Sequence, residues 1–167
     1  MKNQILIIIS ITLIIFGCSD VKKSTDEAVT RIKNEANFKN ETIDLPCTRV
    51  IYKFIGMELK MLTASYGMGD GATDTEFYFE NNKLIFCKVI DSSVAMNTNT
   101  DGSVKMENVV VEYNYYIENE EISECFSNNV KLDISKIKSY QNPEEIISLS
   151  NQLLKAYNSK DSTVLCK

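Results

Sequence analysis

The chain has 167 residues, a formal net charge of −5 and no histidine. This length suits one domain of ordinary size, and the acidic balance, with no cluster of lysine or arginine, argues against nucleic-acid binding and against electrostatic adhesion to anionic lipid. The missing histidine removes the commonest general base, the usual partner of a serine or cysteine nucleophile and the commonest zinc ligand. We therefore expect a protein that is not an enzyme and that holds no metal or other cofactor.

The chain begins with a short apolar segment. Lys2 supplies a positive charge, and residues 5–16 are apolar apart from Ser10 and Thr12. A helix of this length spans about 18 Å, well short of the roughly 30 Å hydrocarbon core of a bilayer. The segment therefore predicts a cleaved signal peptide rather than a membrane span.

The residues Ile15-Phe16-Gly17-Cys18 resemble the lipobox of bacterial lipoproteins. The resemblance implies that signal peptidase II removes residues 1–17 and that acyl chains such as palmitate on Cys18 anchor the protein in a membrane. The alternative is an ordinary signal peptide whose nearby cysteine joins a disulfide. In enterobacterial lipoproteins, aspartate directly after the cysteine retains the protein in the inner membrane. Because Ser19 stands there, we expect a lipid-anchored protein of the outer membrane, facing the periplasm or the outside.

Cleavage before Cys18 leaves 150 residues with a formal charge of −6. Residues 18–24 are short and polar, as expected of a lipidated tether without regular structure, and residues 25–167 are expected to form a single α+β domain. Ser24 and Glu27 match a capping box, and the apolar residues that follow at helical spacing predict a short helix over residues 25–37.

Alternating apolar and polar side chains predict an antiparallel meander of six strands. The strands are expected over residues 48–55, 58–66, 76–80, 83–91, 105–117 and 122–126. Asn81-Asn82 predicts a tight hairpin turn, since asparagine tolerates positive φ. The glycine-rich residues 67–71 and the polar residues 92–103 predict loops.

An amphipathic helix is predicted over residues 143–158. Asn142 provides an N-cap, Pro143 suits the first turn, and two acids follow where the helix dipole favours negative charge. Its apolar stripe consists of Ile146, Leu149, Leu153 and Tyr157. We expect the stripe to pack on the sheet, against the residues around Val50 and Phe54 or around Val109 and Tyr113.

Besides Cys18, the chain has four cysteines, an even number for a protein expected in an oxidising compartment. They are Cys47, Cys87, Cys125 and Cys166. Two disulfides are predicted, each contributing about 2 to 4 kcal/mol, and the three possible pairings stay open. Zinc binding and free thiols are the alternatives, although the even spacing lacks the close pairs of a four-thiolate site.

Aromatic residues could form a binding surface. Alternation places Tyr78 and Tyr116 on the face opposite Phe77 and Tyr115, where they could contact a peptide or carbohydrate, and core packing is the alternative. The acidic residues 70–76 lack the ligand spacing of a calcium loop and predict a solvated turn. The tyrosine-rich meander resembles uncharacterised lipoproteins of Gram-negative bacteria, a likeness of layout that implies no site residue.

These features favour a non-catalytic, lipid-anchored binding module of the cell envelope, with a protein or glycan ligand. The alternative is an inhibitor of a secreted hydrolase such as lysozyme, because small β lipoproteins are known to block basic lysozymes and a charge of −6 attracts a basic partner. An enzyme that uses a pair of carboxylates is a third possibility, which needs two acids facing each other across a cleft.

Overall fold

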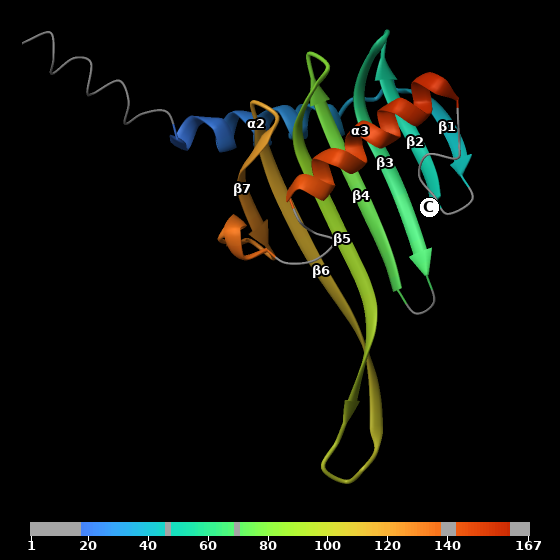
Figure 1. The fold of residues 1–167 in the computed structure, drawn as a ribbon, viewed down its shortest axis with the longest axis vertical. Coiled ribbons are helices and arrows are strands. Elements are labelled where there is room, and N and C mark those ends of the chain that lie inside the picture. The colour runs from blue at the N-terminus through green and yellow to red at the C-terminus, as the bar shows by residue number, and fades with distance from the viewer. Residues whose placement is uncertain (1–17, 46–47, 69–70, 138–142, 161–167) are drawn as a thin grey trace, which may run out of the picture. The chain divides into compact units, whose positions relative to one another are not determined.

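A computed structural model describes residues 18–45, 48–68, 71–137 and 143–160. The chain divides into two units, Met1–Glu35 and Ala36–Lys167. The described part of the first unit is mainly the helix α2 (Cys18–Lys33), and the second unit contains a sheet, a short 3-10 helix η1 (Ile134–Lys136) and the helix α3 (Pro143–Ser159) (Figure 1).

The helix α2 begins earlier than predicted and includes the residues expected to form an irregular tether. Ser24 is not its N-cap, because it lies inside the helix, where its hydroxyl donates to the carbonyl oxygen of Val21 at 2.9 Å. Lys22 and Asp26 form an ion pair of 2.8 Å at i,i+4, and the basic residues of the last turn suit the helix dipole. The polar residues before Ser24 therefore form part of the helix, although they lack the apolar periodicity from which a helix is predicted.

The second unit is one eight-stranded antiparallel sheet in which every strand pairs with the next in sequence (Figure 1). The strands are β1 (Lys39–Leu45), β2 (Thr48–Ile55), β3 (Glu58–Met68), β4 (Gly71–Glu80), β5 (Lys83–Thr98), β6 (Val104–Glu118), β7 (Glu121–Ser127) and β8 (Val130–Lys131). The α+β class and the antiparallel meander are confirmed, whereas the predicted number of six strands is wrong.

The two missed strands are the edges of the sheet. Among the described strands, β1 pairs with β2 alone, and it has few apolar residues, which is tolerated where one side of a strand faces solvent. β8 has two residues and follows a turn in which Asn128 and Asn129 have φ values of 46° and 69°. Asn81 and Asn82 make the predicted turn with φ values of 51° and 60°. The repeated Asn-Asn pair was therefore a sequence signal for the last hairpin.

Both predicted loops are largely strand. β3 and β4 extend into the glycine-rich stretch as far as Met68 and Gly71, and β5 extends through the polar stretch as far as Thr98, while β6 begins at Val104, directly after it. The turn at the end of this long hairpin is held by the N–H of Asn99, which donates to Ser103 O at 2.8 Å. The sequence analysis did not predict these strand extensions, because their residues are mostly polar or glycine, whereas backbone pairing does not require an apolar face.

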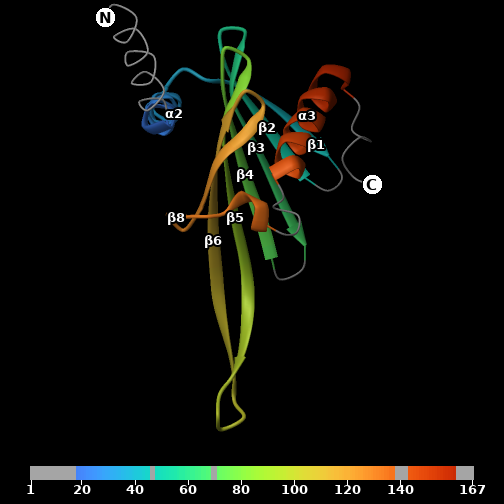
Figure 2. The ribbon, with the colours of Figure 1, turned by 60° about the vertical axis from the view of Figure 1, so that its left-hand side comes forward.

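The helix α3 crosses one face of the sheet (Figures 1 and 2). The hydroxyl of Tyr52 donates to the carbonyl oxygen of Leu153 at 2.8 Å, and that of Tyr157 donates to Glu41 at 2.8 Å. The helix therefore packs near Val50 and Phe54, one of the two predicted regions. Its bounds confirm the prediction, although Asn142 lies outside the described residues.

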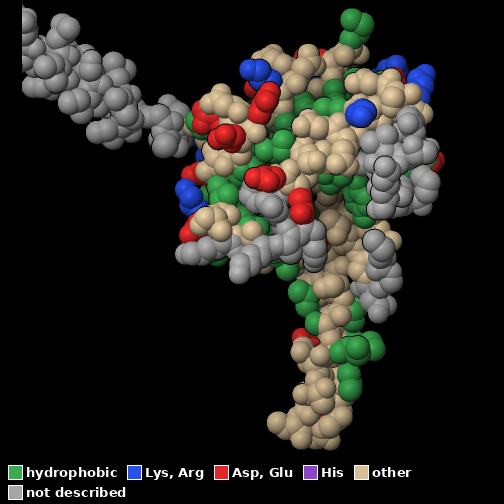
Figure 3. Space-filling model, in the orientation of Figure 1, with side chains coloured by type: hydrophobic (Ala, Val, Ile, Leu, Met, Phe, Trp, Pro, Cys, Tyr) green, Lys and Arg blue, Asp and Glu red, His purple; other side chains and the backbone are tan. Residues whose placement is uncertain are grey.

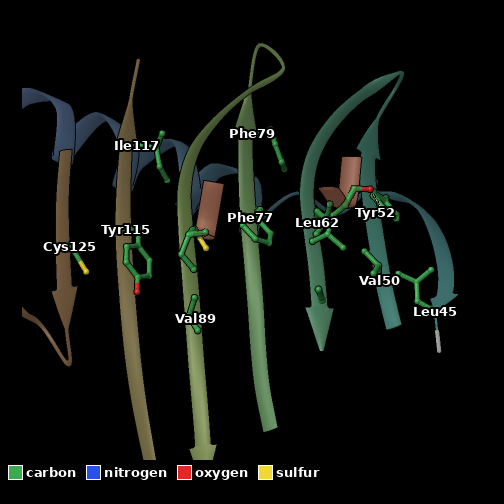
Figure 4. Packing of buried hydrophobic residues seen from close by; sticks show 14 residues of the cluster. Leu45, Val50, Tyr52, Leu62, Phe77, Phe79, Val89, Tyr115, Ile117 and Cys125 are labelled. Carbon is green, nitrogen blue, oxygen red and sulfur yellow. Dashed lines mark hydrogen bonds between the residues drawn. The ribbon is translucent and has the colours of Figure 1, made fainter. Parts of the chain in front are cut away.

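The core lies on this face, where one residue from each central strand points toward α3 (Figure 4). In register across the sheet, the row consists of Tyr52, Leu62, Phe77, Cys87, Tyr115 and Cys125, all fully buried. The predicted alternative region lies on the same face farther along β6, but Val109 is 38% exposed and does not join the core.

Candidate functional site

The predicted lipid-attachment residue, Cys18, is the first residue of α2. The apolar segment of residues 1–17 lies outside the described residues. Among the described helices, none has the length and apolar character needed to span a bilayer. Membrane attachment through acyl chains on Cys18 stays a prediction.

Two of the predicted disulfide cysteines, Cys87 and Cys125, are buried free thiols. Each lies opposite Tyr115, on β5 and β7 respectively, so two strand spacings separate them. That is about 9.5 Å, whereas a disulfide needs Cα atoms within roughly 7 Å. Strand order thus prevents these two from bonding to each other, which rules out the predicted possibility that Cys87 pairs with Cys125, and Cys47 and Cys166 lie outside the described residues.

The buried thiols and phenols should make the protein sensitive to alkali. Burial raises the pKa of Cys87 well above its ordinary value, that of Cys125 to about 11 and that of Tyr52 to about 12. Below pH about 7.5 these groups are protonated in both the folded and the unfolded state, so their titration does not affect the free energy of unfolding there. As the pH rises further, the thiols and phenols of the unfolded chain ionise before the same groups of the folded chain, so unfolding releases protons. The free energy of unfolding should therefore fall between pH about 9 and 12, by up to about 1.4 kcal/mol per pH unit for each group.

Urea denaturation measured at a series of pH values checks this prediction. A Cys125→Ala variant is the control, because removal of the thiol should make the decline from pH about 9 to 11 shallower, whatever the variant's stability at neutral pH. A wild-type curve that is flat above pH about 9 would contradict the burial of these groups.

The predicted binding tyrosines, Tyr78 and Tyr116, lie on the face of the sheet opposite the core row, as alternation indicated. They form a row with Phe86 and Phe126 in which successive ring centroids are 5.7, 5.1 and 5.7 Å apart. The Tyr78 hydroxyl also donates to Glu76 at 2.6 Å. The structure thus brings both tyrosines into one row, in which the ring of Phe86 lies between them and contacts both. Ligand binding by them stays a prediction.

One feature that the sequence analysis did not single out is the far part of the β5–β6 hairpin. β4 pairs with β5 only as far as Ser93, beyond which β5 and β6 continue as a two-stranded ribbon (Figure 1). We call the ribbon together with the residues at its base, residues 93–111, the arm. Exposed apolar side chains lie along it (Figure 3).

Five of these apolar side chains share one face of the arm, because they have even numbers and the two strands pair in unbroken register, whereas Val109 lies on the opposite face. The row, which we call the apolar face, consists of Val94, Met96, Val104, Met106 and Val110, with exposures between 39% and 70%. The period-two alternation of these residues was the signal in the sequence, and it was obscured by intervening Ser, Asn and Thr.

The opposite face of the arm is mainly polar. Lys105 forms an ion pair of 2.6 Å with Glu107, and the side-chain amide of Asn97 donates to Glu107 at 3.1 Å. At the tip, Asp101 accepts hydrogen bonds from the Ser103 hydroxyl and N–H, at 2.6 and 2.9 Å. These bonds, the hydroxyl first, lower the pKa of Asp101. Asp101 is therefore a turn residue that carries a negative charge to the end of the arm.

Two carboxylates from different elements border one shallow hollow. Glu120, in the β6–β7 turn, and Glu144, in the first turn of α3, line it together with polar residues of α3. Both glutamates are exposed, whereas a carboxylic acid that donates protons near neutral pH is usually desolvated. This hollow therefore gives no support to carboxylate-pair hydrolysis. Among the described residues, no three Cys, Asp or Glu side chains gather as metal ligands.

Comparison of the chain with protein-family models, with curated proteins and with solved structures found no match. Its function is therefore inferred from its own residues. The arm, with its exposed apolar face, and the predicted lipid site at Cys18 are the two features that point to a role.

Proposed function

We propose that this protein is a lipid-anchored, non-catalytic binding module of the cell envelope, and that its arm binds a partner protein. The exposed apolar face of the arm is the observation that carries the proposal. Contiguous apolar surface is unfavourable in water, and in soluble proteins such patches commonly mark interaction sites. The other strands and α3 do not cover the apolar face, because the arm extends past both (Figures 1 and 2).

The chemistry of the apolar face favours a protein over a glycan. The face contains valines and methionines and no aromatic ring, whereas carbohydrate sites commonly use aromatic platforms. Methionine adapts its shape to irregular apolar surfaces and is frequent at protein-binding sites. Lys105 is the only basic residue of the arm, so nucleic acid is not a suitable partner.

The proposed location in the cell envelope depends on the lipobox resemblance. Acyl chains on Cys18 supply the anchor, since the acidic chain has no basic cluster that could hold it to anionic lipid. Ser19 after the lipidated cysteine favours the outer membrane. A module tethered there can present the arm to proteins of the envelope.

A face-specific substitution tests the role of the arm. Met96→Lys places a charge on the apolar face, whereas Ser93→Lys places the same charge on the opposite face of the same strand. Proteins captured from solubilised envelope by the wild-type full chain are identified, purified and titrated against all three forms. We expect Met96→Lys to weaken the complex at least about tenfold, from the lost burial of one methionine, and Ser93→Lys to bind as the wild type does. Equal affinity of the two variants would rule out the apolar face.

The inhibitor hypothesis has one specific observation in its favour, namely that the arm ends in a narrow turn whose charged residue is Asp101. A narrow acidic hairpin end suits the cleft of a basic hydrolase. Inhibition of a purified basic muramidase by the wild-type chain, lost in Asp101→Asn but not in Met96→Lys, would favour this second function. No inhibition by the wild-type chain would remove it.

A further inference from the structure

The arm has an open edge on β6. β7 pairs with β6 only over Tyr113–Glu118, so among the described residues no strand pairs with this side of Val104–Val111. The backbone of Glu112 shows which groups face that side, because its N–H donates to the Asn128 side chain at 3.0 Å and its carbonyl oxygen accepts from the Asn128 N–H at 2.9 Å. Asn128 follows β7 and lies on the side of β6 away from β5.

The alternation of hydrogen bonding in antiparallel strands extends this observation along β6. If Glu112 directs its backbone groups to the open side, then the other even-numbered residues of the arm do so too. The open edge therefore presents the N–H and carbonyl groups of Val104, Met106, Asn108 and Val110. A long exposed edge of this kind is a template for a further strand, and a two-stranded ribbon by itself is only marginally stable in water.

We propose that the open edge of β6 pairs with β6 of a second copy of this chain, antiparallel and around a twofold axis at Met106. The two arms then form one four-stranded ribbon in the order β5, β6, β6, β5, with both apolar faces on the same side. This pairing goes beyond the proposed function and holds without it. It provides the additional strands that stabilise the ribbon.

Charge complementarity selects this register. With Met106 opposite its own copy, Lys105 lies opposite Glu107 of the second copy and Glu107 opposite its Lys105. Met106 is a hydrogen-bonded position toward the open side, so its neighbours form non-hydrogen-bonded pairs, in which side chains approach most closely. Together with the ion pair of 2.6 Å within each strand, the four residues make a ring of alternating charge.

Other registers are less suitable. A twofold axis at Lys105 or at Glu107 places that residue opposite its own copy, so that like charges face each other. A twofold axis at Asn108 places Lys105 opposite Val111 and Glu107 opposite Val109, which leaves the charges without cross-strand partners. It also places Val104 opposite Glu112, whose backbone groups already bond to Asn128. Self-pairing at Met106 therefore satisfies both the backbone and the charges.

A lipid surface is a poorer occupant of this edge. The end of the arm consists of Asn99, Thr100, Asp101, Gly102 and Ser103, which are exposed polar residues and a glycine. Burying them in a bilayer would leave polar groups without water. A strand from another protein could use the same backbone groups, and the experiments below separate it from a second copy.

Cysteine cross-linking tests the twofold axis. In Met106→Cys the two introduced thiols face each other at a Cα separation of about 5.5 Å, which a disulfide can bridge. Thr98→Cys is the matched control, because it lies on β5 of the same arm, and three strand spacings across the ribbon, about 14 Å, and an additional offset along the strands separate it from its copy. With the full chain and diamide as oxidant, we expect a disulfide-linked dimer from Met106→Cys and none from Thr98→Cys. The reverse pattern, or equal cross-linking, would overturn the proposed axis.

Charge reversal tests the register independently of cross-linking. Lys105→Glu places like charges opposite each other twice in the dimer and should weaken self-association about tenfold, as measured by sedimentation of the full chain. The double variant Lys105→Glu/Glu107→Lys restores both pairs and should restore association. A circular dichroism spectrum equal to that of the wild type shows that the variants fold.

The outcome separates this inference from the proposed function. A wild-type chain that is monomeric at all soluble concentrations would overturn self-pairing, and a partner lost on Met96→Lys would still support the binding role. A dimer sensitive to Lys105→Glu in a chain whose Met96→Lys variant loses no partner would support self-pairing alone. A monomer whose β6 edge is protected from hydrogen exchange only by an added partner would assign the edge to a strand of another protein.

Discussion

Replacing Phe77 by alanine is expected to lower the free energy of unfolding by about 3 to 5 kcal/mol. Phe77 is fully buried on β4, in a central position of the sheet, and lies in register between Leu62 and Cys87 under α3 (Figure 4). Truncation removes the buried ring and leaves a cavity that the surrounding strands can fill only in part, because their backbones are held by hydrogen bonds on both sides. Denaturation in urea or guanidinium chloride, with circular dichroism as the signal, measures the loss.

Met57→Ala is the control for this substitution. Met57 lies in the β2–β3 turn and is 99% exposed, so its truncation should change the free energy of unfolding by no more than about 0.5 kcal/mol. Equal effects of the two substitutions would show that Phe77 does not lie in a packed core.

Replacing Cys18 by alanine is expected to move the protein from the membrane fraction to the soluble fraction, or to leave it as an uncleaved precursor. Each buried methylene of an acyl chain contributes about 0.8 kcal/mol, and two or three chains make attachment effectively permanent, so their loss removes essentially all of the anchoring. Fractionation of cells by ultracentrifugation, followed by mass measurement of the purified chain, checks both the location and the acyl groups.

Cys87→Ala is the matched control, since it removes a different cysteine that lies in the core. This variant should stay in the membrane fraction while losing some stability, because the thiol packs between Phe77 and Tyr115 in the register of the sheet. Recovery of Cys18→Ala in the membrane fraction, processed as the wild type is, would overturn the lipoprotein interpretation.

The sequence by itself determined the features of this protein that arise from local physics. The two asparagines at 81 and 82 adopt positive φ and close a tight turn, as their residue type indicated. The helix α3 begins at Pro143 and buries Ile146 and Leu153, because the spacing of apolar residues and the charges of the first turn are local properties. Alternation likewise placed Tyr78 on the face opposite Phe77. The meander follows from short turns between such strands.

Only the tertiary structure decided which strands have partners and which side chains are covered. β1 and β8 form because β2 and β7 provide backbone hydrogen bonds to them. The polar sequences of these two strands do not predict this pairing. The even number of cysteines made Cys87 and Cys125 possible disulfide partners, yet Tyr115 on the strand between them keeps them apart. The apolar alternation of the arm is indistinguishable in sequence from that of a core strand. It is exposed because β5 and β6 are longer than the strands beside them, and the length of a neighbour is a property of the whole sheet.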